Sequence, residues 1–149
     1  MAEYEFVTSL HRPARVTVRN IGEVAATNVR VEITASRRDP VSAVLDVPRK
    51  PEKFGWKMPA IRPISRRDPG EVDIDQNSER TRIEIVCGDL QPGRQVWSNR
   101  FFVGVAVTGD YVLEGLLFAD NLPTPHSFTL TVSATVTRSS LTVEDICSQ

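Results

Sequence analysis

Apolar and polar residues alternate along most of this chain. In RVTVRN (15–20) the valines occupy every second position, and NVRVEITA (28–35) continues the same alternation. A period of two places successive side chains on opposite faces of a β-strand. We therefore predict strands at 15–20, 28–35, 81–87, 100–107, 111–118 and 127–137, with 4–8 and 41–47 as weaker candidates.

The strands are separated by turn-forming sequences, and no stretch has helical periodicity. Short strands with one apolar and one polar face must pack their apolar faces together. The sequence therefore predicts an all-β protein, a single immunoglobulin-like antiparallel β-sandwich of seven to eight strands over residues 1–149. Its core is expected to contain Val16, Val18, Val29, Val31, Ile33, Ile83, Ile85, Phe102, Leu113 and Phe128.

The bulk composition agrees with one globular domain. The chain has 149 residues, of which 40% are hydrophobic and 25% charged. No apolar run approaches the ~20 residues of a membrane helix, so we expect no membrane insertion. The first residues lack the features of a signal peptide, which favours a cytoplasmic location for the chain as given. The location would be extracytoplasmic if the domain belongs to a secreted or anchored protein.

A basic, proline-rich segment interrupts the strands at 48–69. It contains five prolines, which remove ladder donors, so we predict one long loop. The stretch 37–67 carries nine of the 18 basic residues of the chain and three of its 19 acidic ones. Cations beside aromatic residues are typical of protein interfaces. The candidates for contact with a protein partner are Arg49, Lys50, Lys53, Phe54, Trp56 and Lys57.

Two other interpretations of this loop stay open. Phe54 and Trp56 could instead plug an open end of the sandwich, with the lysines solvated. A contact with nucleic acid, through base stacking and phosphate neutralisation, is disfavoured because the net charge of the chain is −1.

The segment DIDQNSERTRIE (73–84) has the acidic spacing of a calcium loop of the EF-hand kind. Asp73, Asp75, Asn77 and Glu84 fall at positions one, three, five and twelve. However, the sixth position is Ser78 instead of glycine, and no flanking helices are predicted. We therefore predict no metal site here, and instead an acidic loop that enters a strand and forms local ion pairs.

The chain offers little for catalysis. His11 and His126 are its two histidines, and Ser127 would point to the opposite face of a strand from His126. No nucleophile, phosphate-binding or dinucleotide motif is present. We predict that the protein is not an enzyme and has no cofactor. Cys87 and Cys147 are expected to be thiols instead of a bridge, and residues 139–149 to be a linker or the start of a helix.

Three motifs resemble bacterial immunoglobulin-like modules of the cell-adhesion-related (CARDB) kind. These are VTVRNIGEVAATNVRVEI (16–33), which resembles their opening hairpin, GDLQPGR (88–94) and TGDYVLEGLLFADN (108–121). In the first, Asn20 and Gly22 suit a tight turn with positive φ. In the third, Tyr111 resembles a tyrosine corner, in which the phenol anchors a strand end to the backbone.

The resemblance implies a non-catalytic interaction or spacer module. Such a module would form part of a larger bacterial protein or assembly and would bind a protein partner through its loops. The alternative is a ligand-binding module, for carbohydrate or calcium, that uses loops at one end of the sandwich.

Overall fold

The computed structural model describes residues 11–36, 41–46, 67–77 and 79–137. These residues form strands and no helix. The strands are β1 (His11–Ala14), β2 (Thr17–Arg19), β3 (Ala26–Ser36), β4 (Val41–Val44), β5 (Val72–Gln76), β6 (Arg80–Leu90), β7 (Gln95–Trp97), β8 (Phe101–Val105), β9 (Gly109–Phe118) and β10 (His126–Ala134). The predicted strand at 4–8, most of the predicted 48–69 loop and the predicted 139–149 tail lie outside the described residues.

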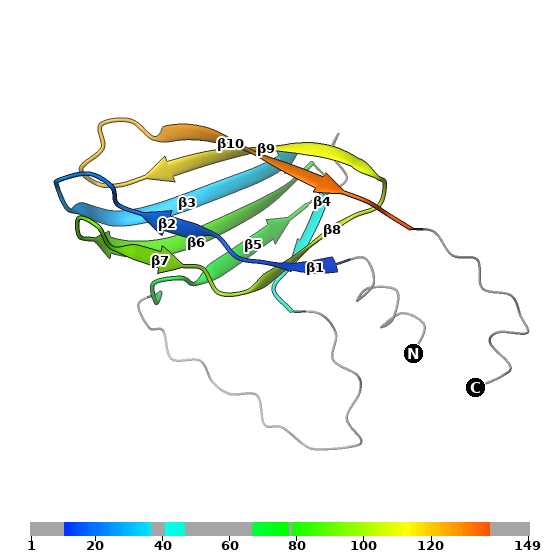
Figure 1. The fold of residues 1–149 in the computed structure, drawn as a ribbon, viewed down its shortest axis with the longest axis horizontal. Coiled ribbons are helices and arrows are strands. Elements are labelled where there is room, and N and C mark those ends of the chain that lie inside the picture. Colours follow the sequence, from blue (N-terminus) through cyan, green and yellow to red (C-terminus); the bar gives the residue numbers. More distant parts are fainter. Residues whose placement is uncertain (1–10, 37–40, 47–66, 78, 138–149) are drawn as a thin grey trace, which may run out of the picture.

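The strands form three antiparallel sheets (Figure 1). The largest has the order β10-β9-β3-β6-β5, a second has the order β1-β8-β4, and β2 pairs with β7. One continuous apolar core lies between the layers, because buried residues of the large sheet and of β4 and β8 belong to the same cluster. The predicted all-β antiparallel sandwich is therefore confirmed.

The core follows from the alternation on the two central strands. Val31 of β3 lies opposite Ile85 of β6, and Ile33 lies opposite Ile83, so the inward faces of the two strands meet as a largely apolar surface. Most of the predicted core is confirmed: Val29, Val31, Ile33, Ile83, Ile85 and Leu113 are buried, and Val16, Val18 and Phe128 pack against them half-buried.

One predicted core residue is wrong. Phe101 is buried, with 3% of its surface exposed, whereas Phe102 is half-buried and lies outside the core cluster. The cause is the register of β8, in which Phe101, Val103 and Val105 share the inward face. Two adjacent phenylalanines leave the face of a short strand ambiguous, and the valines that follow decide it.

The predicted opening hairpin is also wrong. β2 pairs with β7, and β3 pairs with β6 and β9, so the chain crosses from one layer to the other between them. The side chain of Asn20 organises this crossing: its Oδ1 accepts the N–H of Gly22 at 2.9 Å, and its Nδ2 donates to the carbonyl of Val24 at 2.8 Å. The positive φ expected at Asn20 or Gly22 occurs at Asn28 instead, where β3 has an irregular register.

The predicted anchor at Tyr111 is confirmed. Its side chain is buried, and its hydroxyl donates a hydrogen bond to the carbonyl oxygen of Val107. This bond fixes the start of β9 to the turn before it.

Three short strands, β1, β5 and β7, were not predicted. Each lies at a sheet edge or in the two-stranded sheet, and most of its side chains are exposed or half-buried. Strands of this kind do not need apolar residues at every second position, and the short sequences of β1 and β7 show no clear alternation. β5 does alternate, as VDIDQ with Val72 buried, but its two aspartates led the sequence analysis to assign it to an acidic loop.

The thiol of Cys87 is free and buried in the core. Burial raises its pKa from the ordinary value of 9.0 to about 11. Between these two values the unfolded chain releases a proton that the folded chain keeps, so stability falls as pH rises through this window. From pH 8 to pH 11 we expect the unfolding free energy of the wild type to fall about 2 kcal/mol further than that of Cys87→Ala.

Urea unfolding of both chains at the two pH values measures this difference. Other groups titrate in the same range, but they are common to both chains and cancel. An equal loss in the two chains would show that the thiol does not titrate in a buried environment.

Candidate functional site

The residues with calcium-loop spacing form a β-hairpin. Asp73 and Asp75 lie on β5, Glu84 lies on β6, and Asp73 faces Glu84 across the two strands. Asn77 belongs to the turn, where its Oδ1 accepts the N–H groups of Glu79 and Arg80 at 2.9 and 3.0 Å. The oxygen of Asn77 thus stabilises the turn, and the three carboxylates belong to the outer face of the sheet.

Arginines already pair with most of these carboxylates. Arg67 contacts Asp73 at 3.1 Å and Glu84 at 3.0 Å. Arg82 contacts Glu84 at 3.1 Å and Glu32 at 2.8 Å. A cation would compete with two guanidinium groups for the same oxygens. Among the described residues, no group of three or more His, Cys, Asp or Glu side chains could hold a metal ion.

The candidates in the basic loop, Arg49, Lys50, Lys53, Phe54, Trp56 and Lys57, lie outside the described residues. Their role in contacting a partner stays a prediction.

One polar pair was missed by the sequence analysis. His11 of β1 and Ser42 of β4 both lie opposite Gly104 of β8, and their side chains meet with Nε2 3.0 Å from Oγ. The hydroxyl of Ser42 also reaches the carbonyl oxygen of Gly104 at 3.3 Å. Because Gly104 has no side chain, His11 and Ser42 can meet over it, and their contact links β1 to β4 across β8. We interpret this pair as a structural link within the sheet.

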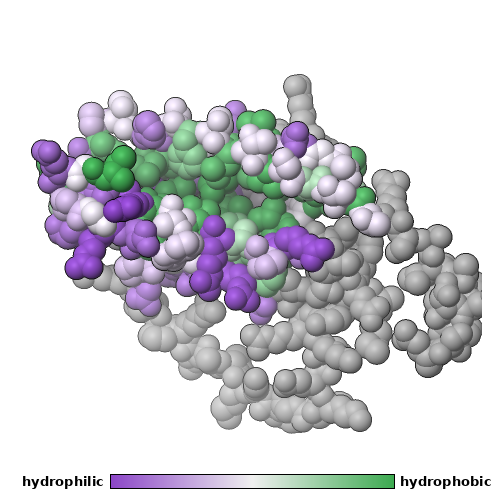
Figure 2. Space-filling model, in the orientation of Figure 1, coloured by the Kyte–Doolittle hydropathy of each residue, from purple (hydrophilic) through white to green (hydrophobic). Residues whose placement is uncertain are grey.

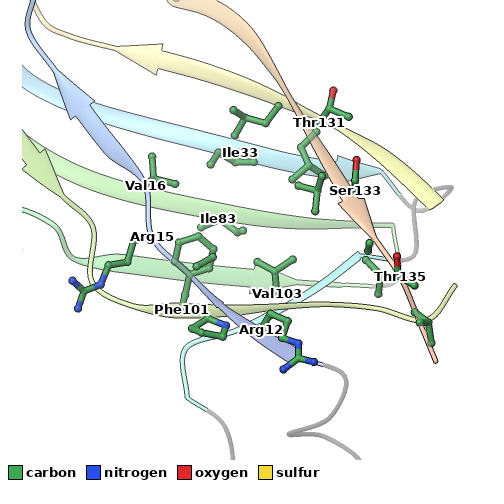
Figure 3. Close-up of a pocket in the computed structure, with 18 of the residues that line it drawn as sticks. Arg12, Arg15, Val16, Ile33, Ile83, Phe101, Val103, Thr131, Ser133 and Thr135 are labelled. Carbon is green, nitrogen blue, oxygen red and sulfur yellow. The ribbon is translucent and has the colours of Figure 1, made fainter. Parts of the chain in front are cut away.

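An apolar groove of about 760 Å³ lies between β1 and β10. Figure 2 shows apolar side chains gathered in a band between polar rims. Figure 3 shows Ile33 and Ile83 of the large sheet at the floor of the groove, with Phe101 and Val103 of β8 beside them. The groove therefore opens directly onto the core of the sandwich.

The groove exists because the sandwich is closed along one side only. On the β4 side, the buried hydroxyl of Thr81 on β6 donates to the carbonyl of Val41 at 3.0 Å, which joins the two layers. On the other side, β1 and β10 each end the order of their own sheet and do not pair with each other. Two strand edges thus flank an apolar opening.

The two rims of the groove differ in charge. The hydroxyls of Thr131 and Ser133 on β10, and of Thr135 just after it, point away from the cavity (Figure 3). On the β1 side Arg12 and Arg15 are exposed, with their guanidinium groups also turned outward (Figure 3). These two arginines are the charged residues that line the groove, and neither forms an ion pair with a described residue.

The edge of β10 lacks the features that usually protect an exposed strand. Natural edge strands are short or carry charges, prolines or bulges that prevent pairing with another chain. β5, at the opposite edge of the sheet, has five residues including Asp73 and Asp75. β10 has nine residues, and no charged residue, proline or glycine occurs from 127 to 137. Such an edge can accept a further strand.

The sequence contained one signal for this groove. The run SFTLTVSATVT (127–137) alternates as a strand, but its polar positions hold only serine and threonine. A long uncharged strand suggests an edge that is covered. The partner edge, HRPA in β1, has no apolar alternation, so the existence of the groove required the fold.

Comparison with known proteins adds no family to this description. No protein-family model matches the chain, and a search of curated proteins finds no match. Over the described ranges, the structure contains no helix with the length and apolar character needed to cross a membrane.

Proposed function

We propose that this protein is a non-catalytic interaction module that binds an extended segment of a protein partner in the groove between β1 and β10. The observation that carries the proposal is the groove itself, an apolar opening of about 760 Å³ flanked by two strand edges. Peptides that add a strand gain main-chain hydrogen bonds from the edge and specificity from the pockets for alternate side chains.

The lining of the groove supports a peptide over a sugar or a metal ion. Its floor is formed by aliphatic and aromatic side chains, and the polar groups that Figure 3 labels on its rims point outward. Carbohydrate and calcium sites require several inward polar groups or oxygen ligands. The proposal keeps the interaction role that the resemblance to CARDB-type immunoglobulin-like modules implies, and the tyrosine anchor at Tyr111 supports that resemblance.

The test is a selection of displayed random peptides against the full chain. We expect enriched peptides to alternate apolar and polar residues, because a strand in the groove turns every second side chain to the core. Val132 is half-buried on the inward face of β10 and lines the groove. Val132→Arg should weaken the enriched peptides by about tenfold or more in fluorescence anisotropy, because it places a charge in an apolar site.

The matched control is Thr129→Arg. Thr129 is exposed on the same strand, faces outward and does not line the groove. This variant should bind the peptides like the wild type. Peptides that bind the Val132→Arg and wild-type chains equally well would contradict the proposed site.

A further inference from the structure

We propose that residues 3–7 of this chain, which precede β1 and lie outside the described residues, occupy the groove as an additional strand. This inference rests on the proposed function, because it assigns to the same groove an occupant that a protein partner must displace. Three observations support it: the sequence of this segment, its attachment to the groove and the charge of the rim.

The sequence of the segment matches the groove. Residues 3–7 read EYEFV, in which the aromatic residues Tyr4 and Phe6 alternate with the carboxylates of Glu3 and Glu5. In an extended chain, alternate side chains point to opposite sides. A strand over the groove therefore directs Tyr4 and Phe6 toward Ile33, Ile83 and Phe101, and turns the two carboxylates to solvent.

The segment is tethered at the rim. Leu10 directly precedes His11, the first residue of β1. Arg12, the residue after His11, already lines the groove. A reversal within residues 8–10 lays residues 3–7 antiparallel along the free edge of β1. Extended, these five residues span about 17 Å, and the four residues of β1 span about 13 Å, so the segment covers that edge completely.

The charges are complementary. Arg12 and Arg15 are the charged residues that line the groove, and in the described part of the chain they have no acidic partner. Glu3 and Glu5 lie on the outward side of the proposed strand, where the arginine side chains also point (Figure 3). Each exposed ion pair contributes little to stability, but such pairs favour the orientation of the added strand in which Glu3 and Glu5 turn outward.

Hydrogen exchange of the full chain, followed by mass spectrometry, tests this inference. We expect the amides of residues 4–7 to exchange about 100-fold or more slowly than in a random coil, because they pair with a strand edge. Phe6→Asp places a charge in the apolar groove and should return these amides to the coil rate. Val7→Asp, the matched control, changes an outward position and should retain the protection.

Three outcomes would overturn the inference. The first is a random-coil rate for residues 4–7 in the wild type. The second is an equal loss of protection in the Phe6→Asp and Val7→Asp chains. The third is protection that disappears on dilution, since the occupant would then be a second copy. Unchanged exchange in β6 verifies that each variant is folded.

Peptide binding separates this inference from the proposed function. Phe6→Asp empties the groove, so selected peptides should bind that chain about tenfold more tightly or better, because a tethered competitor acts at millimolar effective concentration. If residues 4–7 are unprotected but peptides still bind the wild-type chain more tightly than the Val132→Arg chain, only the inference is wrong. If they are protected and no such peptide binds the Phe6→Asp chain, only the proposed function is wrong.

Discussion

Gly70→Ala is expected to lower the free energy of unfolding by about 3 kcal/mol or more. Gly70 has a φ of +95°, a conformation that residues with a side chain rarely adopt. A Cβ at this position would lie 2.5 Å from the carbonyl oxygen of Trp97, which is backbone and cannot rotate away. The N–H of Gly70 also donates to the carbonyl of Val86, and its carbonyl accepts from Asn99, both at 2.6 Å. Relief of the clash would therefore disturb these contacts.

Gly93→Ala is the matched control. Gly93 also has a positive φ, +76°, but a Cβ there would meet no atom within 4 Å. The control isolates the cost of the backbone conformation, about 1–2 kcal/mol. Urea unfolding of the two variants measures the difference. Equal losses would mean that the close approach of Gly70 to Trp97 does not constrain the fold.

Ile85→Ala is expected to lower the free energy of unfolding by about 2–5 kcal/mol, the usual loss when a buried aliphatic side chain is truncated in a core. Ile85 is 1% exposed and lies on the interior strand β6, between Val31 of β3 and Val72 of β5. These neighbours belong to paired strands and cannot collapse into the space left by the missing atoms.

Ile21→Ala makes the same chemical change at a position that is 89% exposed. Its effect should stay within about 0.5 kcal/mol of zero. Guanidinium unfolding followed by fluorescence gives both values. A small effect at Ile85 would contradict the central place of β6 in the core.

The sequence predicted those parts of the fold in which one face of a strand is buried. Val29, Val31 and Ile33 alternate with polar residues, and the structure buries all three. The Tyr111 anchor was predicted for a similar reason, since a tyrosine at a strand start has a specific hydrogen bond to make. At these positions the pattern of burial and the hydrogen bond depend on residues close in sequence, so the local sequence predicts them.

Features that depend on which strands are neighbours were predicted less well. The pairing of β2 with β7 joins residues far apart in sequence, and the 16–33 motif alone suggested a local hairpin. The groove was missed for the same reason, because it arises from the absence of pairing between β1 and β10. The acidic spacing at 73–84 comes from a β-hairpin and not from a metal site. Every second residue of its strands points outward, and Asp73, Asp75 and Glu84 occupy such positions.

The pairing of the first strands with late ones has a consequence for the order of folding. His11 pairs with Gly104, Thr17 with Trp97 and Val31 with Leu117. Contacts of this sequence separation close long loops, which slows folding relative to local pairing. During synthesis at about 5–20 residues per second, β1 must wait roughly 5–20 s before β8 has been made. The edge of β3 meets its first partner strand, β6, only after about 50 further residues have been added. The nascent chain therefore exposes an incomplete sheet throughout this interval, and the final strands, β8 to β10, complete both layers almost together.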